Sequence, residues 1–123
     1  MSWVLDSGRS IYLQIVEKIE LEIVSGKYKP GDKIPSVREL AVEAGVNPNT
    51  MQKAMVELER YGLVHSERTS GRFITEDETM IMEIRKDLAR KQIQEFMERM
   101  KKMGFDGEEI MALLRKTMEE EKI

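Results

Sequence analysis

The sequence contains no cysteine and a single histidine, His65. Without thiols no disulfide can stabilise the fold, and zinc sites built on thiolates are excluded. One histidine cannot supply the several ligands that a zinc ion needs, so we expect neither a metal nor a cofactor. The lack of cysteine suits the reducing cytoplasm, which is where we expect the protein.

Long apolar runs are missing as well. No stretch approaches the roughly 20 apolar residues that a membrane-spanning helix needs. Residues 1–6 (MSWVLD) lack the basic region and the long apolar segment of a signal peptide. The chain also has no Ser-His-Asp arrangement and no glycine-rich phosphate loop. We therefore expect no membrane partner and no enzymatic activity.

The charge balance gives only weak guidance about partners. The 123 residues carry a net charge of −3, which by itself argues against nucleic acid. The cations are nevertheless locally concentrated, because Lys27, Lys29, Lys33 and Arg38 lie within twelve residues that contain one acid, Asp32. A few well-placed cations are enough for salt-sensitive DNA binding. The length suits one ordinary domain, or a small domain with an appendage.

Two short helices joined by a tight turn form the most informative segment. Ser36 and Glu39 have the spacing of a capping box, in which each side chain bonds to the other residue's backbone N–H. Gly45 ends this first helix, Asn47 caps the second, and Pro48 suits its first position. A helix that begins this abruptly can present small polar side chains to base edges in a DNA groove.

The flanking segments complete a recognisable fold. Isoleucines at positions 11, 15, 19 and 23 repeat every four residues and predict an amphipathic helix after a loosely ordered lead at 1–10. Segments 63–66 and 72–75 are predicted strands, with a loop at 67–71. A mainly α fold with a small β-hairpin follows, namely a winged helix-turn-helix domain at residues 1–76.

The remaining residues, 77–123, predict a two-helix region. A long, charged helix at 78–103 is followed by a break at Gly104, and Asp106 and Glu109 have capping-box spacing before a last helix. Two such helices cannot bury both apolar faces alone. They need either the winged domain or a second copy of themselves, and we expect dimerisation through them. Methionine-rich seams repack readily, which leaves room for a small-molecule effector, although no effector domain is evident. The expected interface consists of Ile81, Ile84, Leu88, Ile93, Phe96, Met97, Met100, Ile110 and Leu114.

Four motifs together resemble the GntR family of bacterial transcriptional regulators. They are PSVRELA at 35–41, GVNPNT at 45–50, LERYGLV at 58–64 and SGRFI at 70–74. The short tail is similar to the YtrA-type subfamily, in which two dimerising helices replace a full effector domain. The resemblance implies a homodimer that binds an inverted repeat in double-stranded DNA, usually as a repressor and often at a transporter operon.

The resemblance also assigns DNA-contacting positions. It implies that Arg38 enters the major groove and that the wing tip lies at Gly71 and Arg72. Pro48 and Gln52 stand where many relatives carry a long donor such as arginine, so no bidentate guanine contact is predicted there. The complete expected set is Ser36, Arg38, Asn47, Asn49, Thr50, Gln52, Lys53, Arg68, Gly71 and Arg72.

Simpler interpretations remain open at this stage. Arg38 could be a surface arginine paired with Glu39 or Glu43, and N-capping alone explains Asn47. The whole domain could be a winged-helix module that docks proteins, which the net charge of −3 favours and the wing arginines oppose. Binding that weakens steeply with salt would separate DNA binding from protein docking, because counterion release is peculiar to polyanions.

Overall fold

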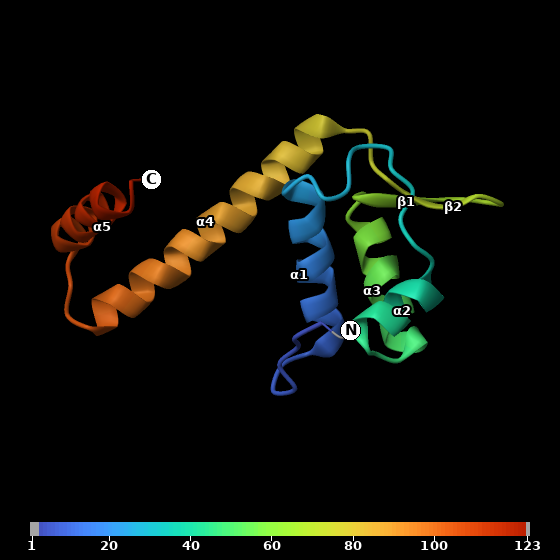
Figure 1. Ribbon diagram of the computed structural model, residues 1–123, viewed down its shortest axis with the longest axis horizontal. Helices are drawn as coiled ribbons and strands as arrows, with labels where there is room; N and C mark the ends of the chain where they lie inside the picture. Colours follow the sequence, from blue (N-terminus) through green and yellow to red (C-terminus); the bar gives the residue numbers. More distant parts are fainter. Residues whose placement is uncertain (1–2, 123) are drawn as a thin grey trace. The chain divides into compact units, whose positions relative to one another are not determined.

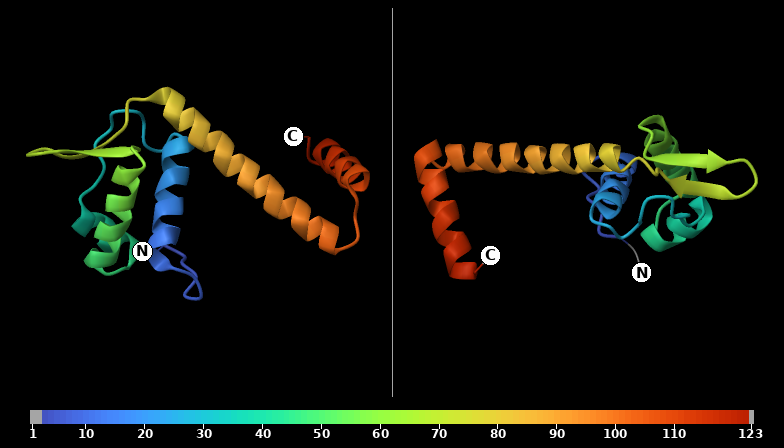
Figure 2. Two further views of the ribbon diagram at one scale, coloured as in Figure 1. Left: turned by 180° about the vertical axis from the view of Figure 1, so that it is seen from behind. Right: turned by 90° about the horizontal axis from the view of Figure 1, so that it is seen from above.

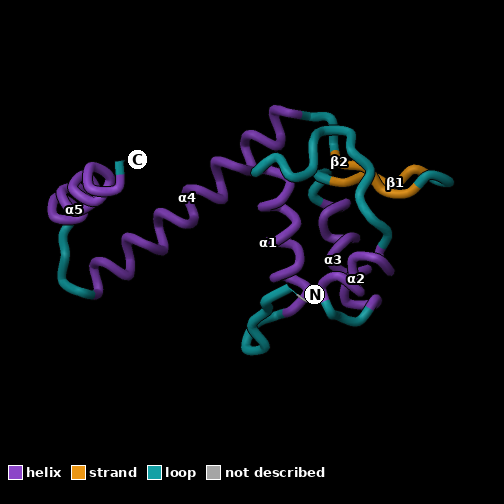
Figure 3. The backbone as a smooth tube through the Cα atoms, in the orientation of Figure 1, coloured by secondary structure: helices purple, strands orange, loops and turns teal. Residues whose placement is uncertain are grey.

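A computed structural model of the chain describes residues 3–122 (Figure 1). Two compact units are present: the first, here the winged unit, extends to Arg85, and the second, the tail unit, begins at Lys86. The mainly helical fold with one hairpin is as expected (Figure 3). The elements are α1 (Ile11–Val24), α2 (Val37–Ala44), α3 (Pro48–Arg60), β1 (Val64–Glu67), β2 (Gly71–Ile74), α4 (Glu78–Lys102) and α5 (Gly107–Glu121).

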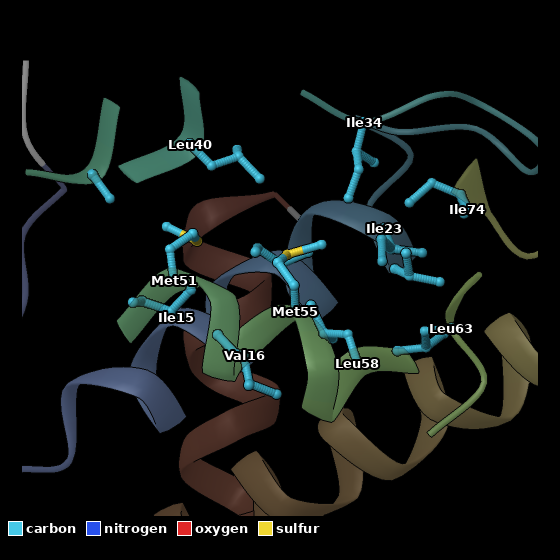
Figure 4. Close-up of a cluster of buried hydrophobic side chains, with 14 of the residues drawn as sticks. Ile15, Val16, Ile23, Ile34, Leu40, Met51, Met55, Leu58, Leu63 and Ile74 are labelled. Atoms are coloured by element: carbon cyan, nitrogen blue, oxygen red, sulfur yellow. The ribbon is translucent and has the colours of Figure 1, made fainter. Parts of the chain in front are cut away.

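The core of the winged unit lies between α1 and α3, which run side by side, with α2 packed on α3. The apolar stripe of α1 contributes Ile15, and the inward face of α3 contributes Met51, Met55 and Leu58 (Figure 4). Ile74 joins them from β2, and all five side chains are fully buried. Each such burial stabilises the fold by about 1.5–3 kcal/mol relative to exposure, so this cluster fixes how α3 sits.

The wing is an antiparallel hairpin that projects away from the three helices (Figure 2). Its register pairs Val64 with Ile74 and Glu67 with Gly71, so the strands begin and end within one residue of the expected limits. The other edge of β2 is paired too, because the Ile34 N–H donates to the Arg72 carbonyl at 3.0 Å. Residues 31–34 therefore support the wing from its second side.

The segment before α1 is ordered rather than loose, contrary to the sequence-based expectation for the part of it that is described. The Asp6 N–H donates to Gln14 Oε1 at 2.7 Å, and Gln14 Nε2 donates to the Asp6 carbonyl at 2.6 Å. The Trp3 N–H donates to the Ala44 carbonyl at 3.3 Å. Gln14 is buried beside the isoleucine stripe, where a polar group needs such partners. Ser10 stands at the N-cap of α1 without a capping side-chain bond.

The first turns of α4 belong to the winged unit. Met80, Ile81 and Ile84 pack against its core, so the division falls after Arg85 rather than after residue 76. The reason is that the core cluster of the winged unit leaves apolar surface that these three side chains cover. Ile81 and Ile84, which were expected at a dimer seam, are thereby engaged within their own chain.

The tail unit contains the rest of α4 and α5. The Asp106 carboxylate accepts from the Glu109 N–H at 2.9 Å, and the Glu109 carboxylate accepts from the Asp106 N–H at 3.1 Å, which confirms the expected capping box. Gly104 has a φ of +95°, a conformation that glycine adopts without strain, and it follows the end of α4. Ile110 is buried, whereas much of the remaining apolar surface of α5 is exposed.

Replacing the Gln14 amide should destabilise the winged unit. Gln14→Ala is expected to lower the free energy of unfolding by about 1–2 kcal/mol, because it removes two hydrogen bonds to Asp6. Urea unfolding followed by circular dichroism measures the change. Glu17→Ala, which breaks the exposed ion pair with Arg9 in the same region, is the control and should cost less than about 1 kcal/mol. Equal losses in the two variants would contradict the clamping role of Gln14.

Candidate nucleic-acid interface

The turn between α2 and α3 has the geometry of a helix-turn-helix. Gly45 adopts the left-handed conformation at φ +73°, and its N–H donates back to the carbonyls of Ala41 and Val42. The Asn47 side chain then caps α3 by accepting from the Asn49 N–H at 2.7 Å. Its oxygen is thus occupied by the cap, as expected from N-capping, while Asn49 lies exposed on the first turn of α3.

The start of α2 is fixed equally firmly. The Ser36 hydroxyl accepts from the Glu39 N–H at 3.1 Å, and the Glu39 carboxylate accepts from the Ser36 N–H at 3.4 Å, which confirms the expected capping box. Arg38 follows on the first turn with an exposed side chain. Within residues 3–122 it forms no ion pair, so Glu39 and Glu43 do not neutralise it. A free guanidinium on a rigid helix end is well suited to an anionic partner.

A groove of about 740 Å³ lies between the beginning of α2, the outer face of α3 and strand β2. Lys33, Arg38 and Arg72 line it together with one acid, Glu39, and with Gln52. The groove therefore carries a local excess of positive charge although the whole chain is acidic. Such segregation is what a polyanion requires.

The sequence predicts Arg72 at the wing tip, but its side chain does not point outward from there. Its Nε donates to Glu59 Oε1 at 2.6 Å, and its Nη2 donates to Gln52 Oε1 at 3.4 Å. The side chain is 21% exposed and lies against α3, because alternation along β2 turns Arg72 toward that helix. Arg68 stays exposed in the turn of the wing, so of the two predicted wing arginines only Arg68 is free to reach outward in the described chain.

Glu59 is the acid that holds this arrangement. Burial raises the pKa of its carboxyl, but hydrogen bonds from Ser66 and Arg72 outweigh burial and bring the pKa below its usual value. A lowered pKa in the folded state means that the stabilisation is present above the unfolded-state pKa and is lost as the pH falls through the folded-state pKa. At neutral pH the Glu59 carboxyl is therefore ionised and accepts both hydrogen bonds.

The family model described as bacterial regulatory proteins, gntR family, matches residues 11–74, just over half of the chain. The chain belongs to the GntR family. Its relatives include the uncharacterized HTH-type transcriptional regulator YhcF of Bacillus subtilis strain 168, 41% identical over 105 residues that cover 85% of this chain and 87% of YhcF. The HTH-type transcriptional repressor YtrA of the same strain is 39% identical over 92 residues, covering 74% of this chain and 71% of YtrA.

Solved structures agree with this assignment. A GntR family transcriptional regulator from Listeria monocytogenes matches with a TM-score of 0.85 and 41% identity, over 91% of this chain and 98% of that one. AraR(DBD), solved in complex with operator ORX1, matches with a TM-score of 0.52 and 33% identity, over 61% of this chain and 92% of that one. The GntR protein is thus a DNA-binding transcriptional regulator with the expected winged helix-turn-helix.

Two further features concern possible metal sites and membrane-spanning helices. In the described part of the chain, no three histidine, cysteine, aspartate or glutamate side chains come together in a way that could hold a metal ion. None of the helices within residues 3–122 is long and apolar enough to cross a membrane.

Two lysines near α3 and the wing, Lys53 and Lys33, make contacts that the sequence did not predict. Lys53, a predicted phosphate contact, has its ammonium 4.0 Å from the centroid of the Tyr12 ring, so it also binds α1 through a cation–π contact. Lys33 was not among the predicted contacts, yet its stem passes directly beside Gly71 in the groove. Its membership of the basic run at 27–38 was the only sequence signal, and only the fold places it under the wing.

Gly71 should tolerate a side chain poorly because of its backbone. Its φ is +113°, so Gly71→Ala adds backbone strain. An added Cβ would lie 2.9 Å from Lys33 Cε, but that atom is near the far end of a flexible side chain and can move aside at little cost. We expect a loss of about 1–2 kcal/mol in the free energy of unfolding. Gly26→Ala has a similar φ of +91° but open space, and serves as the control for strain alone.

Thermal unfolding measures both variants, and the two losses should be similar because the Lys33 side chain can shift. A much larger loss in Gly71→Ala that Lys33→Ala recovers would contradict this expectation.

Proposed function

We propose that this GntR protein binds an inverted-repeat operator as a homodimer and represses transcription by blocking the promoter. The observation that carries the proposal is the groove that combines the free Arg38 with Gln52 on the exposed face of α3. YtrA is named a repressor and the AraR domain was solved on an operator, which supports the same role here. A dimer would place its two copies of α3 in major grooves about one helical turn, or a multiple of it, apart. Such a protein acts in the cytoplasm, where the DNA is.

The proposed contacts divide by chemistry. Arg38 would form a fork with a guanine, and Asn49 and Gln52 would face base edges from α3. Arg68 would approach the minor groove from the wing, where arginine reads groove shape. The remaining contacts position the protein on phosphates without specifying sequence. They are Ser36, Thr50, Lys53, Asn47 through the turn it holds, Gly71 through its backbone, and Lys33.

The proposed dimer uses the tail unit. Met111, Leu114 and Met118 lie on one stripe of α5 at helical spacing and are 55%, 39% and 48% exposed. Ile93 on α4 is 57% exposed. Apolar surface of this extent is typical of an interaction site, and a second copy of the same stripe would cover it.

The half-buried members of the predicted seam would support this stripe. Leu88, Phe96, Met97 and Met100 keep part of their surface exposed and remain in the proposed interface. Ile110 is buried within its own unit, so it supports the interface from behind.

Removing the Arg38 side chain should weaken specific binding. Arg38→Ala is expected to lower affinity for the selected operator at least about tenfold at about 150 mM salt, since a guanine fork contributes roughly 1–3 kcal/mol of discrimination. The operator is obtained by selection from a random duplex pool, and affinities are measured by fluorescence anisotropy. Arg90→Ala removes the same charge from the tail unit and should leave affinity nearly unchanged. Unchanged affinity of Arg38→Ala would remove Arg38 from the site, and selection without an enriched repeat would overturn the proposed function.

Adding charge to the α5 stripe should dissociate the dimer. Leu114→Glu places a carboxylate in the proposed apolar interface, where leaving it buried and unpaired costs several kcal/mol. Sedimentation equilibrium should show a monomer at concentrations where the unsubstituted protein is dimeric. Val42→Glu adds the same charge at a 77% exposed site on α2 and should stay dimeric. A Leu114→Glu protein that remains a dimer would refute the assigned interface.

A further inference from the structure

We propose that Arg72 orients the amide of Gln52, so that the Gln52–Arg72 pair selects guanine over adenine at the base pair that Gln52 faces. The inference rests on the proposed operator binding and adds a specificity rule to it. Arg72 acts here by orienting Gln52 and by donating beside it, whereas the sequence predicts a wing contact in the minor groove for Arg72 and no bidentate guanine contact at Gln52.

The first step is the direction of the Gln52 amide. Arg72 Nη2 lies 3.4 Å from Gln52 Oε1. A guanidinium has only donors, so the atom of Gln52 that faces it must be the oxygen. The Nε2 amino group is then on the other side of the amide, and Gln52 itself is exposed on α3. Gln52 therefore presents donors outward.

The second step is what holds Arg72 in place. Its Nε donates to Glu59 at 2.6 Å, and Glu59 also accepts from the Ser66 hydroxyl of β1. The Arg72 carbonyl accepts from the Ile34 N–H at 3.0 Å, which fixes the backbone below the side chain. With hydrogen bonds to two residues of α3, the Arg72 guanidinium is much less free than that of the exposed Arg38.

The third step is the chemistry of the base edges. A glutamine with both amide atoms free pairs with adenine, because its oxygen accepts from N6 and its nitrogen donates to N7. In this protein Arg72 occupies the oxygen, and the pair offers an amide N–H beside the remaining guanidinium N–H groups. Guanine presents two adjacent acceptors, N7 and O6, in the major groove. The pair is therefore complementary to guanine, whereas Gln52 alone is complementary to adenine.

The test compares base preferences rather than affinity alone. The operator position read by Gln52 is identified as the one whose preference disappears in Gln52→Ala. Guanine and adenine duplexes at that position then compete for the unsubstituted full-length protein and for Arg72→Ala. We expect a guanine preference of at least about fivefold in the unsubstituted protein and a reversal toward adenine in Arg72→Ala. A merely structural role of Arg72 would lower affinity for both duplexes equally.

Two further variants keep the result interpretable. Arg68→Ala removes one wing charge without touching Gln52, so it should weaken both duplexes and keep the guanine preference. Arg72→Lys keeps a cation for Glu59 but lacks the planar fork that spans two acceptors, so it should stay folded and lose the guanine preference.

The possible outcomes are distinct. Retention of the guanine preference in Arg72→Ala or in folded Arg72→Lys would overturn the inference while leaving operator binding intact. An unsubstituted protein that selects no operator at all would overturn the proposed function, and this inference with it.

Discussion

The buried face of α3 is the constraint on which the rest of the winged unit depends. Met51, Met55 and Leu58 are fully buried where α3 packs against α1, α2 and β1, so α3 cannot rotate without exposing them. A helix turns about 100° per residue, and fixing one face therefore fixes the opposite one. The outward positions of Asn49 and Gln52 follow from this packing. The packing of the core thus sets the orientation of the exposed side chains of α3.

Charge placement explains how an acidic chain can have a DNA-binding face. The net charge of −3 describes the whole molecule, but screening limits each charge to a range of about 8–10 Å at physiological salt. Along the lining of the groove beside α3, Lys33 and Arg38 are accompanied by one acid, Glu39, while Arg72 is paired with Glu59. Net charge is consequently a poor guide here, because binding depends on the charges nearest the phosphates.

The parts of the fold that the sequence predicted are those encoded by neighbouring residues. The Ser36–Glu39 and Asp106–Glu109 capping boxes depend on residues three apart, and both are formed. The turn at Gly45 and the cap at Asn47 are equally local. Helix limits, the hairpin and the family resemblance could all be obtained from such signals.

The features that escaped prediction depend on residues far apart in the chain. The sequence predicts Arg72 at the wing tip. It does not reveal the partner Glu59, which lies 13 residues away on another element, because no local pattern links the two residues. Ile81 and Ile84 have the spacing of any apolar helix face, and only packing decides that they cover the core of the winged unit. Which residues contact one another therefore depends on tertiary packing, even where each helix and turn is encoded locally.

In the proposed complex, the Glu59–Arg72 pair would separate affinity from base choice, two tasks that a single arginine often performs. A carboxylate on a recognition helix would repel phosphate, but Arg72 neutralises it at 2.6 Å, so the pair adds no net charge to the interface. In the proposed complex the salt-dependent share of affinity would then fall to the cations without an ion pair in the described chain, Arg38 above all, since counterion release counts net positive charges placed at phosphates. The pair can instead orient the Gln52 amide, because Glu59 holds Arg72 and Arg72 donates to Gln52 Oε1. In the proposed complex, affinity and base choice would therefore be carried by different side chains of the same surface.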